Sequence, residues 1–210
     1  MTTAGQGQAT DARVIRGLLL VALVLVFLGP ALPSSAPGPE GTVAGTEGTG
    51  PLRISPGITV PPEDDAILVP AISLDAALVP IATEGQVLTP PSDTDQVGWW
   101  DLSAEPGSRT GQTVMTGHTV HSGGGVMNEL GALQPGEVVQ VRDEGRLVDY
   151  RATRVQVYSK AELAAAAEEL FGQDHGRGRL VLVTCTEFVD GDYLSNIVVI
   201  ARPVRGASDA

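Results

Sequence analysis

Two residue types in this chain are suited to nucleophilic catalysis together: a single cysteine and a histidine that follows a predicted strand. Cys185 is the only cysteine among 210 residues, so it cannot form a disulfide within the chain. It ends the apolar run 179–185, and His118 follows the strand predicted over 112–116. A free thiol is only slightly ionised at neutral pH, and a neighbouring imidazole can supply positive charge or carry the proton. The alternative is that Cys185 is a small buried hydrophobic residue.

A metal site is another interpretation of the same residues. His118 and His121, together with Cys185, are three side chains that zinc accepts as ligands. Residues three apart on a strand face opposite sides, so the two imidazoles converge only if the chain turns between them. His175 lies in a glycine-containing stretch typical of a solvated loop, and the glycine run 122–125 lacks the Lys-Ser/Thr of a phosphate-binding loop. We therefore expect neither a metal nor a cofactor.

The N-terminus has the pattern of a membrane or export segment. Arg13 and Arg16 precede an unbroken apolar stretch over 17–28. As a helix, twelve to sixteen such residues span roughly 18–24 Å, short of the ~30 Å hydrocarbon layer, and snorkelling arginines or local thinning can close the gap. Small residues at 34–36 also fit a cleavable signal peptide, so an uncleaved signal-anchor and a cleaved peptide are both open. In both, the N-terminal positive charge places the rest of the chain outside the cytoplasm.

Composition divides the chain into four parts. We expect a signal-anchor or transmembrane segment over 1–32, a flexible Pro/Gly-rich linker over 33–57, a folded domain over 58–205 and a tail over 206–210. The net charge of −12 argues against a nucleic-acid partner, which requires clustered Lys and Arg. An odd cysteine in an exported protein suggests intermolecular pairing or a free reactive thiol.

Short apolar runs predict seven or eight strands. The runs are 66–72, 77–81, 112–116, 137–142, 146–150, 154–158, 180–184 and 197–201, and the run over 154–158 either extends the strand over 146–150 or starts a new one. The turn sequence over 143–145 indicates a hairpin. A capping box at Ser159 and Glu162 opens an Ala-rich helix that Gly172 stops, and a shorter helical turn is expected over 126–130. This pattern predicts a predominantly antiparallel, barrel-like β domain with one or two short helices.

Four segments, in order, resemble the sortase family, and the likeness spans roughly residues 66–204. They are Val69-Pro-Ala-Ile-Ser-Leu-Asp-Ala-Ala77, similar to the family's "IPxIxVdaPV" strand; Val97-Gly-Trp-Trp100 with Pro106-Gly107 and Thr116-Gly-His118, similar to the "GWW…PG…GH" block of classes E and F; Val126-Met-Asn-Glu-Leu130 with Leu133-Gln-Pro-Gly136, similar to "vFxxLxxLxpGD"; and Leu182-Val-Thr-Cys185, similar to "L-x-T-C". The resemblance implies a mainly β, eight-stranded sortase barrel outside the cytoplasm, preceded by a single membrane helix and a linker.

The same resemblance implies a cysteine transpeptidase. Cys185 would attack a backbone carbonyl in the C-terminal sorting signal of a surface protein, of the LPxTG or LAxTG kind. His118 would protonate the departing amine. A thioester would follow, resolved by an amine of a cell-wall precursor or by a pilin lysine, so that one hard step becomes two easier ones. A non-catalytic surface-binding domain and a hydrolytic cysteine peptidase are the alternatives.

The chain departs from the family on its last strand. Sortases carry an arginine before a "V-x-A" pattern, whereas this chain reads Tyr193-Leu194-Ser195-Asn196-Ile197-Val198-Val199. Leu194 takes the arginine's place in the class F register "Y-R-D-N-V-V-V", and Asn196 takes it when the register is counted back from Ala201. Leucine cannot donate a hydrogen bond and asparagine can, so Asn196 is the third candidate site residue. Arg154, on another predicted strand, is an alternative donor.

Overall fold

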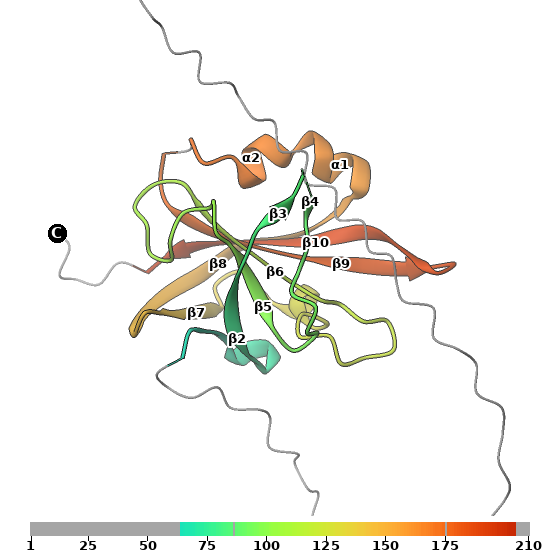
Figure 1. The fold of residues 1–210 in the computed structure, drawn as a ribbon, viewed down its shortest axis with the longest axis horizontal. Coiled ribbons are helices and arrows are strands. Elements are labelled where there is room, and N and C mark those ends of the chain that lie inside the picture. Colours follow the sequence, from blue (N-terminus) through green and yellow to red (C-terminus); the bar gives the residue numbers. More distant parts are fainter. Residues whose placement is uncertain (1–63, 86, 175, 205–210) are drawn as a thin grey trace, which may run out of the picture.

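The computed structural model describes residues 64–85, 87–174 and 176–204, which fold into a closed eight-stranded barrel (Figure 1). Around the barrel the strands are β1 (Ala66–Val69), β2 (Leu74–Ile81), β5 (Val97–Trp100), β6 (Gln112–Gly117), β9 (Arg179–Val189), β10 (Asp192–Pro203), β8 (Arg146–Ser159) and β7 (Val138–Asp143). A small two-stranded sheet pairs β3 (Thr83–Glu84) with β4 (Val87–Leu88). The predicted mainly β, eight-stranded fold is confirmed.

The predicted membrane segment, the linker and the C-terminal tail lie outside the described residues. The division of the chain at 32, 57 and 205 therefore stays a prediction. Within the described part, no helix is both long enough and apolar enough to cross a bilayer.

The directions of neighbouring strands determine which strand ends lie close together in the barrel. Six of the eight neighbouring pairs are antiparallel, and β2–β5 and β6–β9 are parallel. The parallel pair β6–β9 is made possible by the connection that follows β8, which carries α1 (Lys160–Ala165) and α2 (Ala167–Phe171). Parallel strands end at the same edge of a sheet, so residues after β6 lie near the C-terminal half of β9.

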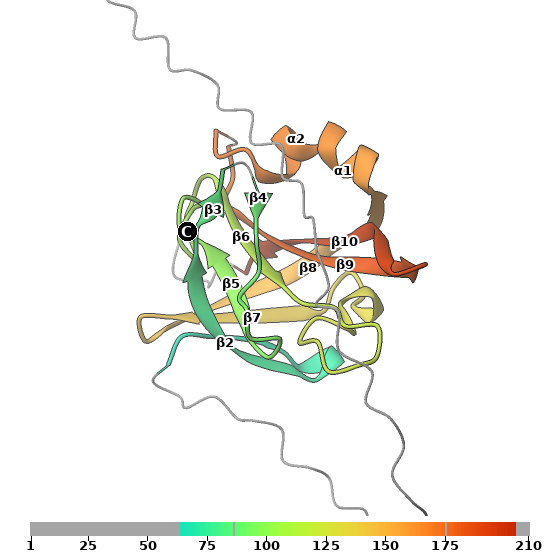
Figure 2. The same cartoon turned by 45° about the vertical axis from the view of Figure 1, so that its right-hand side comes forward.

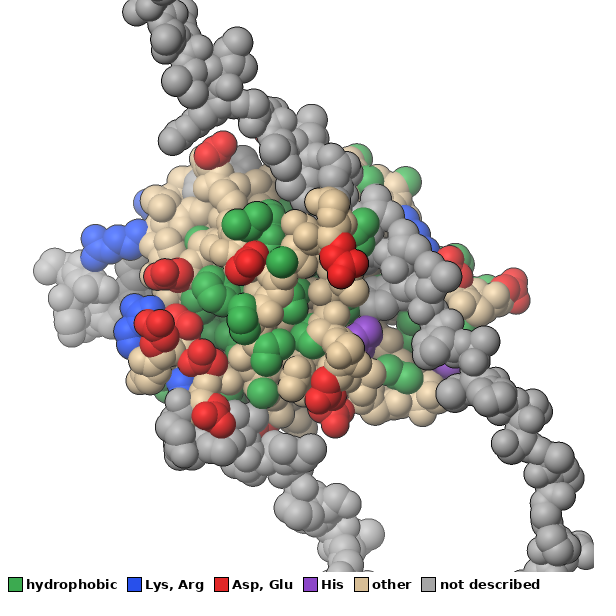
Figure 3. Space-filling model, in the orientation of Figure 1, with side chains coloured by type: hydrophobic (Ala, Val, Ile, Leu, Met, Phe, Trp, Pro, Cys, Tyr) green, Lys and Arg blue, Asp and Glu red, His purple; other side chains and the backbone are tan. Residues whose placement is uncertain are grey.

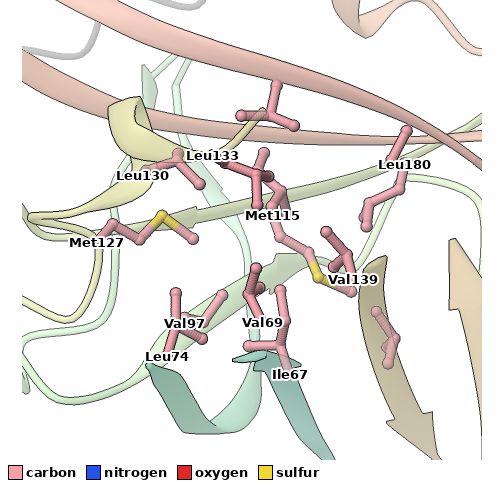
Figure 4. Close-up of a cluster of buried hydrophobic side chains, with 14 of the residues drawn as sticks. Ile67, Val69, Leu74, Val97, Met115, Met127, Leu130, Leu133, Val139 and Leu180 are labelled. Atoms are coloured by element: carbon pink, nitrogen blue, oxygen red, sulfur yellow. The ribbon is translucent and has the colours of Figure 1, made fainter. Parts of the chain in front are cut away.

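Two hydrophobic clusters lie on the two sides of the barrel wall. The interior cluster gathers alternate residues such as Met115, Val97 and Leu180 (Figure 4). The outer cluster packs α1 and α2 against the other face of β6, β9 and β10, and Figures 1 and 2 show both helices on one side of the barrel. On β9, Val181 and Val183 belong to the outer cluster. By the same alternation, Cys185 faces outward on the side that carries the helices.

The structure corrects several predicted boundaries. The first strand ends at Val69, because Pro70–Ile72 forms a 3-10 turn and Ser73 has a φ of 54°. Of the two alternatives for 154–158, extension of the preceding strand is confirmed, because 146–150 and 154–158 form one strand, β8. Strand β5 was not among the predicted runs. Over 126–130 the chain forms turns and then a 3-10 helix at Leu130–Ala132.

The capping box is confirmed. The Ser159 hydroxyl accepts from the Glu162 amide, and the Glu162 carboxylate accepts from the Ser159 amide at 2.8 Å. The helix is interrupted at Ala166, which separates α1 from α2, and the second helix ends at Gly172 as predicted.

Candidate active site

The ends of β6 and β9 bring the predicted cysteine and histidine to the same level of the sheet. The parallel register pairs Thr116 with Val183, and the Thr184 hydroxyl donates to the Gly117 carbonyl at 2.8 Å. Continued by two residues, this register sets His118 level with Cys185. Because side chains alternate along a strand, both residues face the side that carries the helices.

Asn196 is directly opposite Cys185 across the β9–β10 ladder. Its Nδ2 donates to the Thr184 carbonyl at 3.2 Å and lies 3.8 Å from the Cys185 sulfur. Both side chains are buried, at 2% and 3% exposure. Leu194 precedes Asn196 by two residues on the same face and is 48% exposed. The candidate donor beside the sulfur is therefore Asn196.

His118 is half-buried and has a backbone partner that the sequence did not indicate. Its Nε2 lies 2.7 Å from the Pro91 carbonyl oxygen, so the ring N–H donates there. Pro90 and Pro91 are themselves buried, just after β4. The segment that follows the small β3–β4 sheet thus holds the imidazole in place.

The loop after His118 is tied to the β9–β10 hairpin. The Tyr193 hydroxyl donates to the Thr119 carbonyl at 2.7 Å. The His121 ring stacks on Phe188 with centroids 4.0 Å apart, and Phe188 contacts Tyr193 at 5.0 Å. These contacts fix the approach of the two chain segments that carry the candidate catalytic pair.

The zinc interpretation gains no geometric support. His121 is exposed and stacked on a phenylalanine, and the described residues contain no group of three or more His, Cys, Asp or Glu side chains arranged to hold a metal. His175 lies outside the described residues.

Comparison with known proteins decides the family. Residues 67–204 match the family model of the Sortase domain. The chain belongs to the sortase family. No curated protein sequence matches it significantly.

Solved sortase structures share the fold of this sortase. Sortase C-1 from Actinomyces oris superposes with a TM-score of 0.52 at 22% identity, covering 70% of this chain and 77% of that one. Sortase A from Corynebacterium diphtheriae gives 0.55 at 18% identity, covering 71% and 64%. A Clostridium perfringens sortase D5 transpeptidase gives 0.52 at 16% identity, covering 68% and 75%.

Burial raises the pKa of the Cys185 thiol in this sortase to about 12. Lys160 acts in the opposite direction, Asp192 adds to the rise, and the hydrogen bond from Asn196 lowers the pKa. In the resting protein the sulfur is therefore protonated at neutral pH. For Cys185 to act as a nucleophile, a thiolate would have to be generated by proton transfer or by a change in surroundings.

Lys160 is the cation of the site, and sequence reasoning missed it. It is the only lysine in the chain. The ladder pairs Ser195 with Ser159, so the next residue, Lys160, is level with Leu194. Its Nζ lies 3.1 Å from an Asp192 carboxylate oxygen. A signal was present in the sequence, because the capping box fixes Lys160 as the first helical residue, but its strand register was not predictable.

Arg154 does not replace the family arginine. It pairs with Ile200 on the ladder, four residues from Asn196, which is roughly 13 Å along the strand. Its guanidinium binds Glu169 at 3.2 Å. The suggestion that Arg154 serves as the donor is therefore wrong.

Proposed function

We propose that this sortase is a cysteine transpeptidase that cleaves a C-terminal sorting signal of the LPxTG or LAxTG kind. It transfers the acyl group to an amine of the cell wall or of a pilin. The observation that carries the proposal is the parallel register of β6 and β9, which, continued past the ends of the paired residues, sets His118 level with Cys185. Asn196, 3.8 Å from the sulfur, supports the assignment.

In the first half-reaction, the Cys185 thiol gives its proton to the His118 imidazole as the sulfur attacks the scissile carbonyl carbon. The oxygen of the tetrahedral intermediate takes up negative charge. Asn196 offers a fixed amide donor at the sulfur, where such an oxyanion forms. The C–N bond then breaks, the amine leaves with the proton from His118, and a thioester remains on Cys185.

In the second half-reaction, the incoming amine attacks the thioester carbonyl. Its proton passes to His118, the C–S bond breaks, and the sulfur regains a proton. The acceptor is an amine on a cell-wall precursor or a pilin lysine. If water attacks instead, the same groups perform hydrolysis.

Lys160 favours the negative sulfur that both half-reactions need. Its ion pair with Asp192 holds it at the end of β8, where its charge lowers the thiol pKa. The ion pair also tempers that effect, since Asp192 raises the same pKa. Both side chains are about half exposed, so solvent screens the interaction.

We assign residues 1–32 as a single-pass anchor in the cell membrane, with the catalytic domain outside the cytoplasm. The basic flank before the apolar stretch supports this orientation. We expect the linker over 33–57 to have a root-mean-square reach of roughly 25–30 Å, enough to lift the barrel off the membrane. The partners are surface proteins with a sorting signal and an amine acceptor.

A second function, a non-catalytic binding domain, has two observations in its favour. The thiol pKa of about 12 disfavours a resting thiolate, and Leu194 replaces a donor with an exposed hydrocarbon. Such a domain binds a sorting peptide without forming a thioester.

Mass spectrometry of the full chain separates these functions. The protein is incubated with a panel of LPxTG-like and LAxTG-like peptides, and the mass added to Cys185 is followed. We expect an acyl adduct that an added amine consumes, and no adduct in Cys185→Ala. If peptides of the panel bind the protein but none forms an adduct on Cys185, the protein is a non-catalytic binding domain. Equal product with and without amine would identify a hydrolase.

A further inference from the structure

A groove of about 530 Å³ lies at the end of the barrel away from Cys185. Its lining includes Arg109, Arg146, Arg177 and Arg202, four of the 13 Lys and Arg residues in the chain. They come from four segments: the loops before β6 and β9, the β7–β8 hairpin and the end of β10. Figure 3 shows most visible Lys and Arg side chains near the left end of the molecule, with histidines toward the right.

The groove is distinct from the candidate active site. Arg179, which begins β9 beside the groove, precedes Cys185 by six residues, so about 20 Å of strand separates the two places. A ligand in the groove does not touch the thiol.

The backbone around the groove is held firmly. The Gly178 amide donates to the Arg109 carbonyl at 2.7 Å. A Cβ on Gly178 would lie 1.8 Å from the Ser108 carbonyl oxygen, so the two loops approach more closely than any other residue allows. The Gly107 amide donates to the Tyr150 hydroxyl at 2.6 Å. Two of the four arginines therefore project from a fixed frame, which reduces the entropy lost on binding.

The described residues neutralise the positive charge of the groove only in part. Arg109, Arg177 and Arg202 make no ion pair or side-chain hydrogen bond with another described residue. Arg146 makes one ion pair, to Asp143 at 3.4 Å. A single carboxylate, that of Asp149, also lines the groove.

The pKa of the neighbouring Arg179 is affected by the positive charge of the groove. Burial lowers its pKa, and Arg202 and Arg154 lower it further, while Glu169 acts in the opposite direction. In a chain of net charge −12, uncompensated arginines gathered in one place favour an anionic ligand.

The chemistry of the lining selects among anions. One arginine guanidinium group can donate two parallel hydrogen bonds to two oxygens of the same phosphate, with defined geometry. The apolar part of the lining consists of Leu147, Val148, Pro203 and Val204. The volume falls within the usual range for small-molecule sites. We propose that this groove binds a phosphate-bearing ligand, with the phosphate on the arginines and a less polar portion against the aliphatic side chains.

Both ends of the described chain lie at this end of the barrel. Val204, the last described residue, lines the groove. The Asp64 carbonyl accepts from Arg142, and the Asp65 carboxylate accepts from the Glu144 amide in the β7–β8 turn. The first described residues, Asp64 and Asp65, therefore lie beside the groove. This favours a membrane phospholipid headgroup as the source of the phosphate, a point that rests on the proposed membrane location.

Titration calorimetry on the full chain in nonionic detergent micelles tests the site. One arm titrates inorganic pyrophosphate, and the other adds phosphatidylglycerol to the micelles, with phosphatidylcholine as the neutral comparison. The variant R177Q/R202Q removes two uncompensated charges. Arg151→Gln removes an exposed arginine outside the groove that donates to the Gly136 carbonyl.

We expect R177Q/R202Q to weaken binding by about tenfold or more, because each charge-assisted hydrogen bond is strong, and Arg151→Gln to leave it unchanged. If R177Q/R202Q loses affinity for both pyrophosphate and phosphatidylglycerol, the groove is a general phosphate site. If it loses affinity only for phosphatidylglycerol, the groove is a headgroup site. Absence of binding in both arms, or equal weakening by both variants, overturns the proposal. Because the groove is remote from Cys185, R177Q/R202Q should still form the thioester, so the two proposals fail independently.

Discussion

Asn196 lies opposite Cys185 across the β9–β10 ladder, with its Nδ2 3.8 Å from the sulfur and 3.2 Å from the Thr184 carbonyl oxygen. This neutral amide occupies one of the two positions where the family pattern has an arginine. A carboxamide can donate to a developing oxyanion but adds no charge. We therefore expect Asn196 to supply the hydrogen-bonding role of the family's arginine and Lys160 to supply its charge.

Replacing Asn196 with alanine tests the donor role. We expect kcat to fall by about 10²–10³ with little change in KM, since the amide acts on charge that develops in the transition state. The measurement is turnover of a sorting peptide with an amine acceptor. Leu194→Ala, two residues away on the same face, is the matched control and should retain turnover. Equal losses in the two variants would show that Asn196 has no special part.

The buried thiol predicts slow alkylation at neutral pH. With a pKa of about 12, Cys185 should react with iodoacetamide at pH 7.5 about 10²-fold more slowly than free cysteine, because the smaller thiolate fraction outweighs the greater nucleophilicity. The rate should rise about tenfold per pH unit toward pH 12. Because Cys185 is the only cysteine, the mass of the alkylated chain reports this site alone. A rate that levels off near pH 8 would contradict the burial argument.

The same pKa predicts alkaline destabilisation. The folded state keeps the thiol protonated up to about pH 12, whereas the unfolded thiol ionises near its ordinary value of 9.0. The contribution of Cys185 to stability is therefore complete below pH 9 and is lost as the pH rises to 12, approaching about 4 kcal/mol. Urea unfolding between pH 8 and 11 should show a shallower decline for Cys185→Ser than for the wild type. An equal decline of the unfolding free energy with pH in both proteins would contradict this prediction.

Local sequence signals predicted much of the barrel. Alternating apolar residues identified β7 and β8, and the turn between them forms with Glu144 and Gly145 at positive φ, as the hairpin signal indicated. Ser159 and Glu162 specified the start of α1 through hydrogen bonds confined to four residues. These features depend on neighbours in the chain, which a sequence shows directly.

The parts that escaped prediction depend on long-range register. Strand β5 contains only four residues, Val97–Trp100, too few for a periodic signal. The contact from His118 to Pro91 uses a backbone carbonyl, which leaves no mark on the side-chain pattern. Lys160 reaches the site only because β8 and β10 pair Ser159 with Ser195. The sequence therefore singled out the candidate side chains but not the groups that lie against them and influence their charge.

Lys160 and Asp192 should move the reactivity of Cys185 in opposite directions. Lys160→Met removes the cation and should slow alkylation about two- to fivefold at fixed pH, the range expected for a partly exposed charge. Asp192→Asn removes the opposing carboxylate and should accelerate it by a similar factor. Lys160→Arg keeps the charge and should stay near the wild-type rate. Alkylation rates across pH 7–11 for all three variants would reveal a merely structural ion pair, because both deletions would then act in the same direction.

The aromatic contacts at the hairpin should couple its order to catalysis. Phe188→Ala removes the stack on His121 and the contact with Tyr193, and should lower the free energy of unfolding by about 0.5–1.5 kcal/mol. Tyr193→Phe removes the hydrogen bond to the Thr119 carbonyl, worth about 1 kcal/mol. Because both contacts restrain the loop that follows His118, each variant should also reduce kcat/KM, and the double variant should lose less than the sum of the two. Val189→Ala, an exposed hairpin residue outside the ring contacts, should leave both quantities unchanged. If all three variants retain full kcat/KM, the hairpin does not help to position His118.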